Sequence, residues 1–218
     1  MIKALLFDFD GVILESAGIK TAAYRKLLEE NNSPEKVDDF MEYHAANTGI
    51  SRYVKIQYFY EQILGSKLTD TKKEELINKF SEIVFNEILQ ASFVKGMPEF
   101  LEENYKKLPL FVVTGTPTEE INLIIKKRKL NFYFKEVHGA PGEKKDIIFD
   151  ILNRYKWDPG EAVFFGDAQS DLRAAEETGV IFVARITDYS KTLENCKYKI
   201  RDFQGFKIKD LSIRGDKK

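Results

Sequence analysis

Short apolar segments alternate with longer amphipathic segments along much of the chain. Three apolar runs, residues 3–7, 110–113 and 162–165, are almost wholly aliphatic or aromatic, which is typical of strands buried on both faces. Weaker strand patterns and helical patterns alternate after the second run, at residues 116–129, 136–138, 144–155, 171–178 and 180–184. Strands separated by helices of this length predict βαβ units and therefore a parallel sheet.

A different pattern fills residues 18–90, where helical periodicity dominates and strand signals are few. Its most regular helix is expected to open at a capping box, Thr71 to Glu74, and to carry an apolar stripe. That stripe consists of Ile77, Phe80, Ile83, Val84 and Ile88. We therefore expect an α/β fold in which a core domain, residues 1–15 and 92–218, receives an all-helical cap domain, residues 16–91, after its first strand.

The composition narrows the class of function. The 218 residues carry 34 basic and 35 acidic side chains, a net charge of −1, so no overall field attracts nucleic acid or an anionic membrane surface. The single cysteine, Cys196, excludes an internal disulfide. The N-terminal apolar run is too short for a signal peptide, and no stretch is long enough to span a membrane. We expect a cytoplasmic protein, and a monomer in preference to an oligomer.

Two pairs of aspartates stand directly after predicted strands. Asp8 and Asp10 follow the first apolar run, and Asp167 and Asp171 follow the run that ends at Phe165. Ligands of open parallel sheets bind outside the carboxyl ends of the strands, and all four carboxylates should lie at that edge. Carboxylates crowded in this way repel one another unless a cation lies among them. The pattern therefore predicts a divalent metal and an anionic substrate.

The spacing of the first pair suits phosphoryl chemistry. Residues i and i+2 of an extended chain point the same way and lie roughly 6.5–7 Å apart, so a phosphoryl group fits between Asp8 as nucleophile and Asp10 as proton donor. The alternative is a plain turn, in which the Asp side chains bond to the local backbone and Gly11 permits the bend. The buried strand before the pair counts against that alternative, because two unpaired carboxylates beside a core are costly.

Two further segments supply groups for an anion. Thr114 and Gly115 offer a hydroxyl and backbone N–H groups near the start of a helix, which Thr116 is expected to cap. Lys144 stands at a helix N-terminus, where a cation is unfavourable, so we expect it to neutralise the substrate and keep the nucleophile ionised. Lys145 is the weaker candidate for this role and is expected at the surface.

A charge estimate favours a metal. Four carboxylates and a phosphate dianion sum to about −6, and Lys144 offsets only one of these charges. At ~5 Å and an effective dielectric constant of ~20, each like-charge pair costs roughly 3 kcal/mol. A hard divalent ion with oxygen ligands, for which Mg²⁺ is the best fit, removes much of that cost. A protonated Asp10 removes more and supplies the acid that a leaving alkoxide needs.

Taken in order, these segments resemble the haloacid dehalogenase superfamily, specifically its magnesium-dependent phosphatases. The first motif matches at residues 8–12, the second at Thr114, the third at Lys144 and the fourth from Gly166 to Asp171. The resemblance covers roughly residues 1–15 and 92–200 and implies a Rossmann-like core. The helical insertion resembles the cap of phosphoglycolate phosphatase and β-phosphoglucomutase.

The same resemblance implies roles for the four aspartates. Asp8 attacks phosphorus to give an aspartyl phosphate, and Asp10 protonates the leaving group and then activates water. Mg²⁺ is held by the carboxylates of Asp8 and Asp167 and by the backbone carbonyl of Asp10, with Asp171 near its water shell.

Four residues of the insertion and hinge are candidates for binding substrate. Gly49 to Arg52 resembles a β-phosphoglucomutase loop whose arginine binds a distal phosphate, so Arg52, and with it Lys55, is a candidate for holding a second anionic group. The alternative is a helix cap at Ser51 followed by a surface arginine. Glu15, near the hinge, stands where relatives carry Asp. Lys20 replaces the histidine that relays protons in the mutase, which counts against mutase activity.

We therefore expect a Mg²⁺-dependent phosphatase that acts on a small phosphorylated metabolite, a sugar phosphate or phosphoglycolate, through an aspartyl phosphate. One alternative is a phosphohexose mutase that uses the same aspartyl phosphate. A less favoured alternative is a non-catalytic binding protein that kept the fold. His44 and His138 lack partners at ligand spacing and are expected to be packed or surface histidines.

Overall fold

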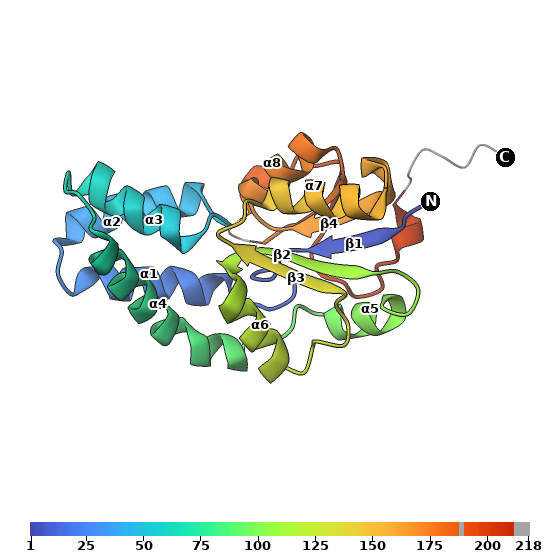
Figure 1. Ribbon diagram of the computed structural model, residues 1–218, viewed down its shortest axis with the longest axis horizontal. Helices are drawn as coiled ribbons and strands as arrows, with labels where there is room; N and C mark the ends of the chain where they lie inside the picture. Colours follow the sequence, from blue (N-terminus) through green and yellow to red (C-terminus); the bar gives the residue numbers. More distant parts are fainter. Residues whose placement is uncertain (188–189, 212–218) are drawn as a thin grey trace.

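The computed structural model describes residues 1–187 and 190–211, with an α/β core at one end and a lobe of helices at the other (Figure 1). The core contains a six-stranded sheet in the order β3-β2-β1-β4-β5-β6, and every neighbouring pair of strands is parallel. The strands are β1 (Ala4–Phe7), β2 (Leu110–Pro117), β3 (Glu136–Ala140), β4 (Ala162–Gly166), β5 (Ile181–Arg185) and β6 (Tyr198–Ile200). The predicted fold class, a Rossmann-like parallel sheet with an inserted helical cap, is confirmed.

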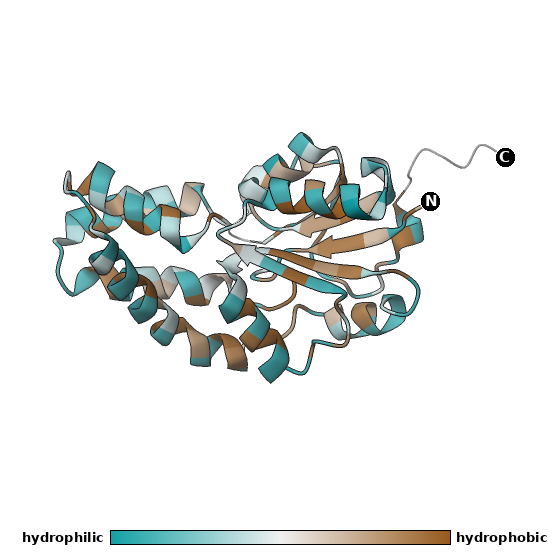
Figure 2. Ribbon diagram, viewed as in Figure 1, coloured by the Kyte–Doolittle hydropathy of each residue, from teal (hydrophilic) through white to brown (hydrophobic). Residues whose placement is uncertain are grey.

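The first strand occupies the middle of the sheet and is buried on both faces. Leu5 pairs in register with Leu110 of β2 on one side and with Val163 of β4 on the other. Leu5 and Phe7 pack in one apolar cluster, whereas Ala4 and Leu6 pack in a second cluster across the sheet. Figure 2 shows the same concentration of apolar residues on the strands.

Two layers of helices cover the sheet. Helices α5 (Met97–Asn104) and α6 (Thr118–Lys127) contribute to the first cluster, and α7 (Lys144–Tyr155) and α8 (Gln169–Thr178) contribute to the second. Figure 1 shows the two pairs of helices on opposite faces of the sheet. The predicted end of α8 at Gly179 is confirmed, since this glycine caps the helix with a φ of +76°.

The insertion after β1 consists of helices α1 (Ala17–Glu29), α2 (Pro34–Ala46), α3 (Arg52–Tyr58) and α4 (Asp70–Gln90), with a π-helical turn at Phe59–Ile63. The capping box predicted at Thr71 is wrong. The N-cap of α4 is Thr69, two residues before the predicted Thr71, and its Oγ1 accepts a hydrogen bond from the Lys72 backbone N–H at 3.3 Å.

The two connecting segments between the insertion and the core run beside each other. Leu14 forms a bridge with Phe93, and the backbone N–H of Glu15 donates to the carbonyl of Ser92 at 2.9 Å. The division of the chain after residues 15 and 91 stays a prediction, and the last predicted core residues, 212–218, lie outside the described residues.

Strand β6 is not predicted by the sequence pattern, because its three residues are half-buried or exposed and carry no apolar run. Among the residues that the structure describes, no helix is both long and apolar enough to cross a membrane.

Candidate active site

The carboxyl ends of β1, β2 and β4 meet the insertion around one cavity of about 80 Å³. The core contributes Asp8, Asp10, Thr114, Gly115 and Asp167 to its lining. The insertion contributes helix α1, helix α3, His44 of α2 and the loop before α3. Most of the predicted site residues therefore surround a single space between core and cap.

Three carboxylates and one lysine form a buried cluster on the core side of this cavity. Asp8, Asp167 and Asp171 each place a carboxylate oxygen within 4.8 Å of the others. The Nζ of Lys144 lies 3.1 Å from Oδ2 of Asp8 and 2.5 Å from Oδ1 of Asp171. Burial opposes the charge on Lys144, but the carboxylates of Asp171 and Asp8 outweigh burial and raise its pKa. Lys144 therefore stays a cation that holds the Asp8 side chain.

One lysine does not balance the three carboxylates. Burial, with the nearby charges of Asp8 and Asp171, raises the pKa of Asp167 well above its ordinary value. A hard divalent cation among these oxygens would relieve that repulsion, and carboxylates are the ligands such cations prefer. Gly11 belongs to the same arrangement, because a Cβ at this position, where φ is +78°, would lie 2.0 Å from Oδ2 of Asp167. The residues therefore fit a divalent metal.

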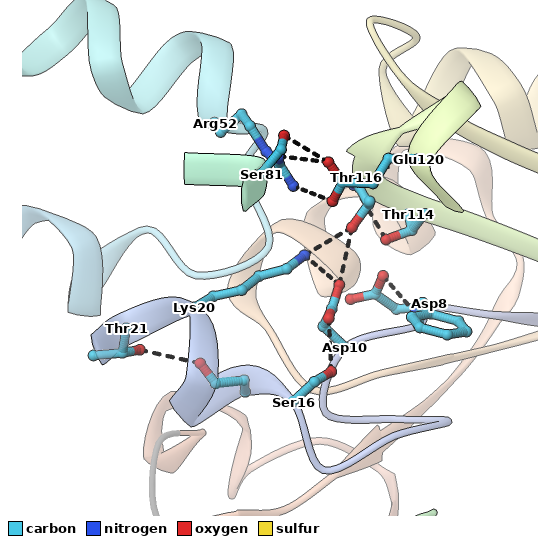
Figure 3. A network of polar contacts seen from close by, with 12 residues as sticks. Asp8, Asp10, Ser16, Lys20, Thr21, Arg52, Ser81, Thr114, Thr116 and Glu120 are labelled. Carbon is cyan, nitrogen blue, oxygen red and sulfur yellow. Dashed lines mark hydrogen bonds and ion pairs between the residues drawn. The ribbon is translucent and has the colours of Figure 1, made fainter. Parts of the chain in front are cut away.

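Three donors hold the side chain of Asp10 (Figure 3). Its carboxylate accepts hydrogen bonds from Ser16 at 2.6 Å, from Thr116 at 3.0 Å and from the Nζ of Lys20. Burial favours the neutral acid, but Lys20 and the hydroxyls outweigh burial and lower the pKa of Asp10. In the protein without substrate these donors favour the ionised carboxylate of Asp10, and the protonated form expected beside a bound phosphate stays a prediction. The side chain of Asp10 is not one of the three clustered carboxylates.

The predicted anion-binding segment lies at the end of β2. Thr114 is buried, its Oγ1 accepts a hydrogen bond from the backbone N–H of Thr116 at 3.3 Å, and it lines the cavity together with Gly115. A Cβ on Gly115 would lie 2.7 Å from the carbonyl oxygen of Gly49, so the absence of a side chain there lets the insertion loop approach the core.

Arg52 lies at the cavity but is already paired (Figure 3). Its guanidinium donates to both carboxylate oxygens of Glu120, at 2.7 and 2.6 Å, and to Ser81 at 2.5 Å. It also packs over the ring of Phe80 at 4.7 Å. Because Glu120 belongs to core helix α6, this ion pair joins the insertion to the core.

The other predicted residues occupy distinct places. Lys20 reaches from α1 to Asp10 and Thr116, and all three segments that carry these residues meet at the cavity. Glu15 does not line the cavity; it lies where the chain enters the insertion, and Arg185 donates to both of its oxygens at 2.6 and 3.0 Å. Lys145 lies at the surface between Glu143 and Glu177.

Sequence reasoning missed a buried polar group in the insertion. His44 is packed, as expected, but its Nδ1 lies 2.8 Å from the Nζ of Lys55 and its Nε2 lies 3.0 Å from Oγ1 of Thr21. The available signal is helical spacing, since His44 follows Val37 and Phe40 on the buried face of α2. Both Lys55 and His44 line the cavity.

A family model, curated relatives and solved structures all resemble this chain over most of its length. Residues 5–185 match the family model described as haloacid dehalogenase-like hydrolase. The chain is 26% identical over 188 residues to a phosphorylated carbohydrates phosphatase of Thermotoga maritima, with 82% of each chain covered. It is 22% identical over 197 residues to a phosphoglycolate phosphatase of Haemophilus influenzae, covering 86% of this chain and 87% of the relative. A β-phosphoglucomutase structure from Clostridium difficile shares the fold, with a TM-score of 0.76, 16% identity and coverage of 97% and 96%.

Proposed function

The chain belongs to the haloacid dehalogenase-like hydrolases, and we propose that it is a Mg²⁺-dependent phosphatase that hydrolyses a small phosphate monoester through an aspartyl phosphate. The observation that carries this proposal is the setting of Asp8. Its buried carboxylate faces the cavity, pairs with Lys144, and lies within reach of two further carboxylates that need a cation. Relatives named as phosphatases of phosphoglycolate and of phosphorylated carbohydrates support a substrate of that type.

In this mechanism an oxygen of Asp8 attacks phosphorus and the ester bond to the substrate oxygen breaks. Lys144 and the backbone around Thr114 and Gly115 hold the phosphoryl oxygens and neutralise part of their charge. Bound Mg²⁺, held by Asp8 and Asp167 with Asp171 close by, would supply further neutralisation of those oxygens.

Asp10 and Lys20 provide the proton chemistry. The hydrogen-bonded pair of Asp10 and Lys20 holds a proton beside the position of the leaving oxygen. The leaving oxygen takes this proton as the ester bond breaks. In the second step, the Asp10 carboxylate accepts a proton from the water that attacks the aspartyl phosphate, and phosphate is released. Ser16 and Thr116 keep the Asp10 side chain in place through both steps.

A phosphohexose mutase is the second candidate, because it would use the same aspartyl phosphate. The observation in its favour is the fold shared with β-phosphoglucomutase, which at 16% identity does not separate the two reactions. Lys20 counts against it, because it stands where the mutase has a proton-relaying histidine and its Nζ is engaged by Asp10 and Thr116.

The deciding experiment measures phosphate release from phosphoglycolate, several sugar phosphates and nucleoside monophosphates, with Mg²⁺ and with EDTA. Release that requires Mg²⁺ and is abolished in Asp8→Asn, with the fold intact by circular dichroism, supports the proposal. A sugar phosphate converted to its positional isomer with little free phosphate would identify a mutase. No turnover by correctly folded protein would leave a binding protein as the remaining interpretation.

A further inference from the structure

We propose that Lys55 binds a second anionic oxygen group of the substrate, so that the substrate is a phosphate monoester that also carries a carboxylate or another phosphate. This inference rests on the proposed function, because it concerns the same cavity. Lys55 lies on helix α3 of the insertion, and the nucleophile Asp8 lies on the core side of the same cavity.

Lys55 differs from the other buried cations in having no carboxylate partner. The described residues include three other buried Lys and Arg side chains, and each contacts an acid: Arg52 with Glu120, Lys144 with Asp8 and Asp171, and Arg185 with Glu15. The half-buried Lys20 contacts Asp10. Lys55 is only 2% exposed, yet within the described part of the chain no Asp or Glu lies at ion-pair distance from its Nζ.

The contacts that Lys55 does make orient its amine without cancelling its charge. Its Nζ lies 2.8 Å from Nδ1 of His44 and 5.6 Å from the ring centre of Tyr24. Burial and the charge of Lys55 lower the pKa of His44 to about 3, so the imidazole is neutral. With Nδ1 accepting from Lys55, Nε2–H donates to Thr21, whose hydroxyl donates in turn to the carbonyl of Ala17 at 3.2 Å. This chain of hydrogen bonds fixes where the Lys55 amine lies.

An unpaired buried cation is unfavourable unless a ligand completes it. Burial, together with Lys20 and Lys144, lowers the pKa of Lys55 to about 7, so its surroundings disfavour the charged amine. An anionic oxygen arriving in the cavity would supply the missing partner. A carboxylate or phosphate then gains a charge-assisted hydrogen bond that a neutral hydroxyl does not.

The contacts of Arg52 make Lys55 the better candidate for binding the second anionic group. The two terminal nitrogens of Arg52 both donate to Glu120, and Oε2 of Glu120 also accepts a hydrogen bond from Ser81. The cavity is small as well: about 80 Å³ corresponds to roughly five to eight water-sized positions. A compact substrate with its second acidic group a few bonds from the phosphate would fill it.

The test compares substrates that differ only in the second group. Phosphoglycolate is paired with its neutral amide, phosphoglycolamide, and fructose 1,6-bisphosphate is paired with fructose 1-phosphate. Each is assayed with the wild type, with Lys55→Met and with a control, Lys36→Met. Lys36 is a half-buried lysine of the same insertion whose Nζ donates to the carbonyl of Ile63, and it does not line the cavity.

We expect Lys55→Met to lower the preference in kcat/KM for the charged member over its neutral partner by about tenfold or more. Lys36→Met should leave that preference unchanged. The pair that responds shows whether the second group is a carboxylate or a phosphate. Equal losses on both members of each pair, or no change in either preference, would overturn the proposal.

A binding measurement separates this inference from the proposed function. Calorimetric titration of phosphoglycolate and fructose 1,6-bisphosphate into Asp8→Asn, with and without Lys55→Met, needs no turnover. If the wild type hydrolyses nothing but Lys55→Met still weakens binding of one compound about tenfold, the phosphatase proposal fails and the Lys55 site stands. If neither binding nor preference depends on Lys55, the Lys55 site fails whatever the enzyme hydrolyses.

Discussion

Replacement of Glu120 by glutamine should weaken the contact between insertion and core. Glu120 is the carboxylate partner of Arg52, whose side chain is only 2% exposed, while Glu120 itself is 11% exposed. Removal of one partner from a buried ion pair typically costs 3–5 kcal/mol, because the other charge is left buried without compensation. Ser81 and the ring of Phe80 remain in contact with the guanidinium, so we expect a value near the lower limit, about 3 kcal/mol.

A double-mutant cycle in urea measures this energy. Glu120→Gln, Arg52→Met and the double variant are compared with the wild type, and the double variant should be more stable than Glu120→Gln because it contains no unpaired buried charge. Glu29→Gln is a matched control, since its pairing with Arg25 at 3.4 Å is exposed and its loss should change the free energy of unfolding by less than about 0.5 kcal/mol.

Two results would refute this reasoning. A loss below about 1 kcal/mol in Glu120→Gln would mean that the ion pair does not hold the insertion to the core. If Arg52→Met instead left stability unchanged and lowered kcat/KM for a bisphosphate, Arg52 would be a substrate ligand, as its resemblance to the mutase loop implies.

Three further predictions concern the cavity. Gly11→Ala should reduce the free energy of unfolding by about 1–2 kcal/mol and weaken Mg²⁺ binding, because φ is +78° at this position and the new Cβ would meet Asp167. Urea unfolding and calorimetry measure the two effects. An unchanged Mg²⁺ affinity would contradict the proposed ligand set. Lys144→Met should lower kcat by about a hundredfold or more in a phosphate-release assay, because it leaves Asp8 without its cation. Lys55→Met should be more stable than the wild type at pH 6, with the advantage disappearing between pH 7 and about pH 10.5. Burial lowers the pKa of Lys55 to about 7, so between pH 7 and about pH 10.5 the unfolded chain binds more protons than the folded protein. The free energy of unfolding of the wild type therefore rises with pH over this range, by at most about 5 kcal/mol. Urea unfolding at several pH values checks this, and a pH-independent difference would contradict it.

The part of the site carried by strand ends could be predicted from the sequence. Asp8 and Asp167 each come directly after an apolar run that forms a buried strand. Because these two strands are parallel, their carboxyl ends lie at the same edge of the sheet and bring the two carboxylates together. Lys144 could be singled out because a lysine opposes the dipole at a helix start, and the structure places it against Asp8.

The insertion was less predictable because its important contacts join different helices. Arg52 and Glu120 are 68 residues apart, and no periodic pattern indicates that α3 and α6 meet there. His44 and Lys55 lie on two helices whose relative rotation decides whether the imidazole and the amine face each other. The ionised state of Asp10 likewise depends on the reach of Lys20 from α1, which sequence spacing does not give.

The central position of β1 also bears on the order in which the chain folds. Leu5 pairs with Leu110, so β1 and β2 close a loop of about 100 residues, and such closure becomes more costly in entropy as the loop lengthens. The bond between Glu15 and Ser92 holds the two ends of the insertion together. Once the insertion has folded on its own helices, only about 26 residues of free chain remain between β1 and β2, which lowers the cost of closure by about 1.2 kcal/mol. The lobe that lines the cavity thereby also favours pairing of the central strand, and its early folding would speed formation of the sheet.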